Sequence, residues 1–250
     1  MEKGQGNLGA PVSKRARLHF SSESKTLKFP EIAAGVTEDE FLASYYIFQA
    51  LLIRGVANEA QPMGLADVRS LFQSSDPKVQ ASWCNENTDD SKSNDSPMDF
   101  LDLRSKQQRW YGSFIAQKTD ATELKILAQK LPLGQLPLSK FQNSPHSTKI
   151  TYDDTFWFFI GYNETTRPFQ GRPLHTDFVT HGGTWHLQIC GVKNWYIKPT
   201  LELLEKCPGL QEQEYLVNCQ AGDLFVINTC LWLHRTEIPN TLNSRDRVSI

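Results

Sequence analysis

The stretch that decides the fold is Gly171–Thr200, which reads GRPLHTDFVTHGGTWHLQICGVKNWYIKPT. It contains the triplet HTD, from His175 to Asp177, followed by a strand-like run, a glycine turn at Gly191 and a second strand-like run that begins at Lys193. Alternate side chains of an extended strand point to the same face, so His175 and Asp177 can reach one ion from a single strand end. The stretch therefore predicts two strands joined by a tight turn, with two metal-ligating side chains at one end.

A third candidate ligand is His234, which follows the apolar run Gly222–Ile227 further along the chain. That run predicts a turn and a buried strand, which would return His234 to the strand end that carries His175 and Asp177. Two imidazoles and one carboxylate that leave one coordination face open are the ligand set of non-haem Fe(II) oxygenases. The triplet alone is a weak signal, because by plain counting about half of chains of this composition contain an H-x-D or H-x-E. A histidine that caps a loop through a hydrogen bond is the alternative interpretation of His175.

Lys193 stands in an apolar setting, beside Val192 and two residues before Trp195. A cation in such a setting is costly unless it is paired with an anion. One interpretation is that Lys193 binds a dicarboxylate whose other end chelates the metal. The alternative is a lysine on an edge strand that faces water, which is a common device against aggregation.

The 250 residues predict one folded domain, at 25–250, behind a disordered leader at 1–24. Thr37 stands three residues before Glu40, which is the signature of a capping box, so a helix is expected to begin at Thr37. The other elements expected in the first 150 residues are a strand at Leu51–Gly55, a helix at Leu65–Phe72, an exposed loop at Asn85–Pro97, a strand at Trp110–Ala116, a helix at Thr122–Lys130 and a connector at Leu131–Ser147.

Short strands with glycine- and proline-marked turns dominate the rest of the chain. They are expected at Phe156–Tyr162, Thr184–Cys190, Lys193–Ile197, Tyr215–Asn218, Asp223–Asn228 and from Arg247 onward, with a short helix or a loop at Leu201–Glu205. The apolar run Phe156–Phe159 predicts a strand buried on both faces, and its alternative is a platform for stacking nucleic-acid bases. The fold class is therefore mainly β, with a helical N-terminal third that supports a β-barrel or a double-sheet jelly roll.

Composition bears on the class of partner and on the compartment, and it leaves nucleic acid unsupported rather than excluded. The net charge of −2 gives no electrostatic reason to expect nucleic acid as a partner, since domains held mainly through phosphates are usually strongly basic. The five cysteines form no C-x-x-C pair and follow no secretory leader, which predicts reduced thiols in the cytoplasm or the nucleus and argues against a zinc finger. No run reaches the roughly 18 apolar residues of a membrane span. The basic cluster Lys14–Arg17 is either a nuclear address or part of a solvated tail.

Three segments of the sequence resemble one known family, the Jumonji C (JmjC) domains of the cupin superfamily. They are HTD at 175–177, GVKNWYIKP at 191–199 and GDLFVINTCLWLH at 222–234. FPEI at 29–32 and ALLIRG at 50–55 resemble the entry of JmjC hydroxylases, so the likeness covers Phe29 to Ile250. It implies a double-stranded β-helix, the jelly roll of cupins. The chain stops at Ile250, inside what would be the last strand of that barrel, which leaves open whether the barrel closes.

The resemblance assigns roles to eight residues. It implies that His175, Asp177 and His234 bind Fe(II), that Lys193 binds the distal carboxylate of 2-oxoglutarate, and that Thr184, Trp195 and Tyr111 help to hold this cosubstrate. Arg247 is a rival partner for the carboxylate, because RDRVS at 245–249 is similar to the R-x-S of other 2-oxoglutarate oxygenases, although the GVKNW context favours Lys193. His181 and His186 have no counterpart in the family and are interpreted as surface or hydrogen-bonded histidines.

By this resemblance the protein is an Fe(II)- and 2-oxoglutarate-dependent dioxygenase that uses O₂ and releases succinate and CO₂. We expect it to hydroxylate a protein side chain in the nucleus or the cytoplasm, because no reader domain or zinc module of the kind that accompanies many histone demethylases is present. Alternatives with the same chemistry are demethylation of an N-methyl group and hydroxylation of a tRNA base. A non-catalytic JmjC-like binding module and a zinc hydrolase with the same ligands are alternatives of other classes.

Overall fold

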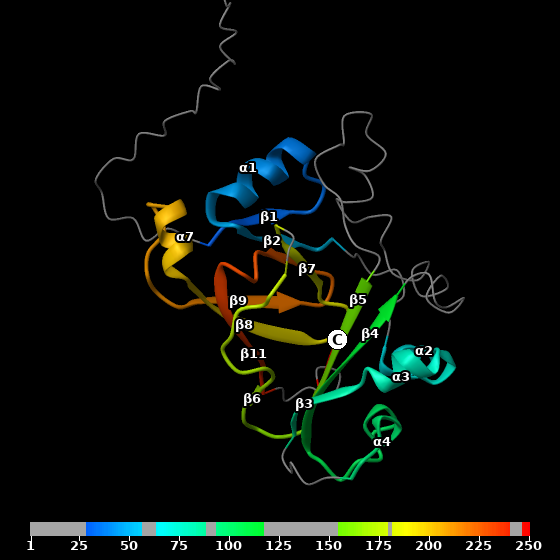
Figure 1. Ribbon diagram of the computed structural model, residues 1–250. Helices are drawn as coiled ribbons and strands as arrows, with labels where there is room; N and C mark the ends of the chain where they lie inside the picture. The colour runs from blue at the N-terminus through cyan, green and yellow to red at the C-terminus, as the bar shows by residue number, and fades with distance from the viewer. Residues whose placement is uncertain (1–28, 57–63, 89–93, 118–154, 180–181, 241–246) are drawn as a thin grey trace, which may run out of the picture.

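The computed structural model describes residues 29–56, 64–88, 94–117, 155–179, 182–240 and 247–250. Within these residues the protein is mainly β, with three four-stranded sheets and a few short helices (Figure 1). The strands are β1 Glu31–Ala33, β2 Ala50–Arg54, β3 Cys84–Thr88, β4 Arg109–Gln117, β5 Thr155–Asn163, β6 Phe169–Gln170, β7 Thr184–Leu187, β8 Val192–Pro199, β9 Tyr215–Gln220, β10 Leu224–Ile227, β11 Trp232–Ile238 and β12 Val248–Ser249. The helices are α1 Glu38–Phe48, α2 Leu65–Ser74, α3 Pro77–Ala81, α4 Pro97–Leu101 and α7 Leu201–Lys206. This agrees with the mainly β class expected from the sequence.

The first sheet has the strand order β1-β2-β10-β7, and its central strands are buried on both faces. One face lies beneath α1, which the capping box of Thr37 and Glu40 starts as predicted (Figure 1). That face forms a cluster of Phe41, Tyr45, Leu51, Ile53, Val56, Leu224 and Val226. The alternate side chains of β2 and β10 point the other way and pack against the second sheet. Burial on both faces explains the continuous apolar runs of these two strands.

The second sheet has the order β6-β11-β8-β9, and its strands alternate cleanly between buried and more exposed residues. The buried residues of β8 are Lys193, Trp195, Ile197 and Pro199, and those of β11 are Trp232, His234, Thr236 and Ile238. This face packs against Ala50, Leu52, Phe225 and Ile227 of the first sheet. Lys193 and His234 therefore point from neighbouring strands into the space between two sheets.

The third sheet has the order β12-β5-β4-β3 and carries the short helices α2, α3 and α4 beside β3 and β4 (Figure 1). Its other face brings Tyr111 and Phe159 against Phe169 and Ile238 of the second sheet. The expected burial of β5 on both faces is wrong at its start, because the Trp157 side chain is 46% exposed. Phe156 packs against the core cluster that contains Phe114 and Phe158, whereas Trp157 points to the opposite face, so among the described residues this end of β5 is covered on one face.

Several other expectations need correction. The segment expected as a loop at Asn85–Pro97 contributes its first residues to β3, which pairs with β4, while Pro97 begins α4 behind the N-cap Ser96. His234 follows the strand β10 as expected and lies within the next strand, β11, whereas His175 is held by an isolated bridge rather than a regular strand. The expected leader, the helix at Thr122–Lys130 and the connector at Leu131–Ser147 lie outside the described residues. None of the helices in the described segments is long and apolar enough to cross a membrane.

Candidate metal centre

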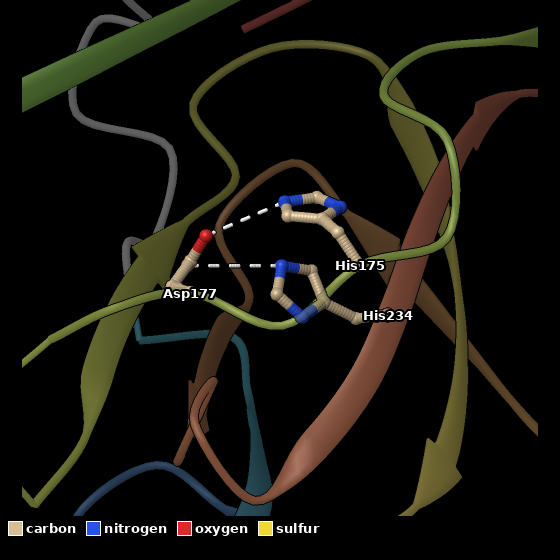
Figure 2. A group of neighbouring side chains, drawn as sticks. All are labelled: His175, Asp177 and His234. Atoms are coloured by element: carbon tan, nitrogen blue, oxygen red, sulfur yellow. Dashed lines mark ion pairs between the residues drawn. The ribbon is translucent and has the colours of Figure 1, made fainter.

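His175, Asp177 and His234 bring one ligand atom each to within 4.8 Å of one another, so the three residues could hold a metal ion. Figure 2 shows the two imidazole rings side by side, both facing the carboxylate of Asp177. The Nε2 atom of His175 lies 3.3 Å from Oδ1 of Asp177, and the Nε2 atom of His234 lies 3.7 Å from Oδ2. Two nitrogens and a carboxylate oxygen in this arrangement suit a first-row divalent metal.

Backbone hydrogen bonds hold the two ligand segments together. His175 and His234 exchange both of their N–H···O bonds, at 3.0 and 2.8 Å, and the Asp177 N–H donates to the carbonyl of Thr229 at 3.0 Å. The thiol of Cys230 also donates to the Asp177 carbonyl at 3.2 Å. The segment that carries the HTD triplet is thus fixed to β11 and to the turn before it, without a regular strand.

The outer nitrogen of each imidazole is engaged by the backbone. Nδ1 of His175 lies 2.6 Å from the Pro173 carbonyl, and Nδ1 of His234 lies 3.1 Å from the Trp232 carbonyl. When the proton of a neutral imidazole is on Nδ1 and donates to a carbonyl, the lone pair is on Nε2. In this tautomer Nε2 can bind a metal. Burial, the largest influence, lowers the pKa of His234, which favours the neutral ligand form.

Lys193 is the most unusual residue near this centre. Its side chain is 0% exposed, and Nζ has no hydrogen-bond partner among the described residues. Nζ lies 5.5 Å from the ring centre of Tyr111 and 5.9 Å from that of Phe159. Burial lowers the pKa of Lys193 to about 7. The alternative of an edge-strand lysine in water is wrong, because β8 lies between β11 and β9 and Lys193 points inward.

Two further residues expected in the cosubstrate site surround Lys193. Tyr111 is 2% exposed and its hydroxyl lies beside Thr236, while burial raises the pKa of the phenol. Trp195 is 8% exposed, its ring centre lies 5.6 Å from that of His234, and its Nε1 has no hydrogen-bond partner among the described residues. Buried donors without a protein acceptor, on the face that also carries a metal ligand, would suit a polar or anionic ligand.

The other expected site residues take different positions. Thr184 lies on β7, and its hydroxyl is 3.2 Å from that of Thr229. Arg247 is partly exposed and pairs with Glu164 at 3.3 Å, so it does not share the setting of Lys193. His186 is hydrogen-bonded to Gln188 at 3.1 Å, as its interpretation as a hydrogen-bonded histidine expects.

Burial, the larger cause, and the nearby charge of Lys193 lower the pKa of His186 to about 3. His186 is therefore a neutral neighbour of Lys193. His181 lies outside the described residues.

Two residues near the candidate metal ligands were not identified from the sequence. Arg172 Nη1 lies 4.0 Å from Oδ1 of Asp177, and Arg172 Nε lies 3.3 Å from Oε2 of Glu86. The position of Arg172, three residues before His175, is a weak local signal. Glu86 lies in a polar segment without pattern, and nothing in the sequence connects it to the site.

Comparison with known proteins gives no independent assignment. No model of a protein family matches the chain, and no curated protein sequence matches it. The chemistry of this centre is therefore argued from its own residues.

Proposed function

We propose that the protein is an Fe(II)- and 2-oxoglutarate-dependent dioxygenase of the JmjC type, built on a double-stranded β-helix, which hydroxylates a protein side chain. The observation that carries the proposal is the buried Nζ of Lys193, which lacks a hydrogen-bond partner among the described residues and lies on the same interior face as the candidate metal ligand His234. Iron and 2-oxoglutarate, when bound with O₂, supply the oxidant for a C–H bond while the cosubstrate becomes succinate and CO₂.

The residues fit a small dicarboxylate. A carboxylate beside Lys193 would supply the missing anion, and in a buried site a charge-assisted hydrogen bond is stronger than a neutral one. Tyr111 lies against Lys193, which supports a role for its phenol in holding the same carboxylate. The buried Trp195 indole and Thr236 lie on the same interior face of the second sheet as Lys193 and His234. A metal held by His175, Asp177 and His234 alone would keep its other coordination positions open to a chelating 2-oxo acid.

The surface next to the ligands supports a protein substrate. Leu174 and Phe178, which each adjoin a metal ligand in the sequence, are 47% and 105% exposed. The nearby cation, Arg172, is already paired with two carboxylates, so it is not a free partner for a phosphate. Exposed apolar side chains beside a neutralised cation favour a peptide over a nucleic acid.

The test uses protein purified without oxygen and reloaded with Fe(II). We expect Fe(II)-dependent conversion of 2-oxoglutarate to succinate, measured by mass spectrometry, even without a substrate. His175→Ala and Asp177→Ala are expected to abolish metal binding, whereas Lys193→Ala raises the 2-oxoglutarate requirement and leaves the metal bound. Metal-loaded protein that neither binds nor converts 2-oxoglutarate would rule out this function. Equal loss of metal in all three variants would make Lys193 structural.

A further inference from the structure

We infer that Arg172 is a positioning residue that orients the carboxylate of Asp177 for metal binding, and that Glu86 holds the guanidinium in place for this purpose. The inference rests on the metal centre of the proposed function, and it does not depend on which reaction that centre catalyses.

The guanidinium of Arg172 is held from three directions. Its Nε lies 3.3 Å from Glu86 of β3, and its carbon CZ lies 5.5 Å from the ring centre of Trp157 of β5. Its Nη1 lies 4.0 Å from Oδ1 of Asp177. The other oxygen of Glu86, Oε1, accepts a hydrogen bond from the Ser113 hydroxyl at 2.6 Å. The chain of contacts thus runs from the third sheet to the metal ligand.

The contact with Asp177 affects how its carboxylate is turned. Oδ1 faces both Arg172 and His175, while Oδ2 faces His234. A carboxylate is free to rotate about its bond to Cβ unless its oxygens are held, and groups that hold metal ligands from outside typically contribute about 10- to 100-fold to metal affinity. Among the described arginines and lysines, Arg172 is the one that pairs with Asp177.

The charge of Arg172 alone would weaken metal binding, whereas orientation of Asp177 would strengthen it. Glu86 separates these two effects because it neutralises the charge. A cation about 4 Å from a ligand oxygen repels a divalent metal, and Arg172 without Glu86 would weaken binding by this route. The Glu86 carboxylate neutralises that charge, so the pair contributes little net field at the metal. What remains is the orientation of Asp177. Removal of both charges together therefore isolates the positioning role.

The decisive variant is the charge-neutral double substitution Glu86→Gln with Arg172→Gln. We expect its affinity for Mn(II), measured by titration calorimetry, to fall about 10- to 100-fold. The visible absorption spectrum of the Co(II)-loaded protein is expected to change as well, because it reports the coordination geometry. Arg172→Lys keeps the charge pair but lacks the planar fork that reaches Glu86 and Asp177 at once, so it is expected to lose about tenfold.

The chain offers a matched control in Arg235 and Glu214. Arg235 pairs with Glu214 at 3.1 Å and lies 3.7 Å from the ring centre of Tyr196, on the outer face of β11. Glu214→Gln with Arg235→Gln removes the same charges and the same kind of contact on the strand of His234. We expect its Mn(II) affinity and its Co(II) spectrum to match those of the wild-type protein.

Each result decides the matter. Unchanged metal affinity and an unchanged Co(II) spectrum in the Glu86/Arg172 variant would overturn the inference, as would equal losses in both double variants. Should the double variant fail to fold, Arg172→Lys decides alone by the same two measurements. Wild-type protein that binds no divalent metal would overturn both this inference and the proposed function. Wild-type protein that binds metal without converting 2-oxoglutarate overturns the proposed function only, and the affinities still decide the role of Arg172.

Discussion

Burial of the charged side chain of Lys193 destabilises the folded protein. The side chain is fully buried and its Nζ lacks a hydrogen-bond partner among the described residues, so burial destabilises its charged form. Because its pKa is lowered to about 7 in the folded protein, the unfolded chain binds more protons between pH 7 and the usual lysine value of 10.5. The unliganded protein should therefore gain stability as the pH rises through this range.

Lys193→Met is predicted to stabilise the unliganded protein and to weaken 2-oxoglutarate binding. Methionine has a similar volume and shape but no polar atom, so the free energy of unfolding at pH 7 should rise by about 1–3 kcal/mol. Denaturant unfolding and calorimetry with 2-oxoglutarate measure the two effects. Lys198→Met is the matched control, because Lys198 lies on the same strand, is partly exposed and pairs with Glu212. A loss of stability in Lys193→Met would mean that the lysine supports the fold.

The affinity for 2-oxoglutarate is predicted to fall as the pH rises above about 7. The carboxylate requires the charged form of Lys193, which the unliganded protein loses above that value. Each further pH unit should weaken binding about tenfold, since a proton must be taken up with the ligand. Calorimetry between pH 6 and pH 9, with the metal held at saturation, gives the profile. A flat profile would show that Lys193 does not pair with the ligand.

At the level of single residues, the sequence identified three candidate ligands that the fold brings together, and it singled out Lys193. His175, Asp177 and His234 belong to two segments that each carry a recognisable pattern, and Lys193 follows one glycine turn. The partnership of Arg172 with Glu86 could not be predicted, because it depends on β3 lying beside the segment that follows β6, where Asn87 donates to the Gln170 carbonyl. Pairing between strands far apart in sequence leaves no local trace.

The turn between β7 and β8 is the element on which the position of Lys193 depends. Gly191 has φ +68°, and a Cβ atom there would lie 2.0 Å from the carbonyl oxygen of Val248 in β12. Glycine is therefore required both by the left-handed backbone and by the close approach of β12. The Ile250 carbonyl also accepts hydrogen bonds from Ile189 and Cys190, just before the turn.

Gly191→Ala is predicted to destabilise the protein by about 1–3 kcal/mol, because the backbone is strained and β12 must move. Gly209→Ala is the control, since a Cβ atom there meets nothing within 4 Å, and its effect should stay within about 0.5 kcal/mol. Denaturant unfolding compares the two variants. Equal losses of unfolding free energy in the two variants would show that β12 moves away from the new Cβ atom without destabilising the protein.

The elements that the sequence predicted correctly are those with strong local patterns. The helix at Thr37 has a capping box, and β8 and β10 have apolar residues beside glycine turns. The polar strand β3, with the sequence CNENT, was interpreted as a loop. It is a strand because β4 offers it an unpaired edge, and a polar segment accepts such pairing without an apolar face of its own. The start of β5 has the composition of a strand buried on both faces, but among the described residues only the face of Phe156 packs against a core cluster.

At the scale of the whole molecule, the three candidate ligands come from parts of the chain that are far apart in sequence. His175 and Asp177 belong to the segment between β6 and β7, while His234 belongs to β11. The mainly β class followed from the number of strand patterns, but the grouping into three sheets depends on long-range pairing that no segment encodes alone. A metal that binds all three ligands would tie these segments together in the folded state only.

Metal is therefore predicted to stabilise the folded protein as a whole. A ligand that binds only the native state adds about 2.7 kcal/mol at a free concentration 100-fold above its Kd. For a chain of this size each kcal/mol raises Tm by about 2–4 °C. Mn(II) should raise the Tm of the wild-type protein in a scanning calorimeter, and Asp177→Ala should remove most of that increase. Arg247→Gln, a change outside the described metal ligands, should retain it. An equal rise in Tm for the wild-type protein and Asp177→Ala would mean that the metal binds elsewhere, since the carboxylate supplies the one negative charge among the three ligands.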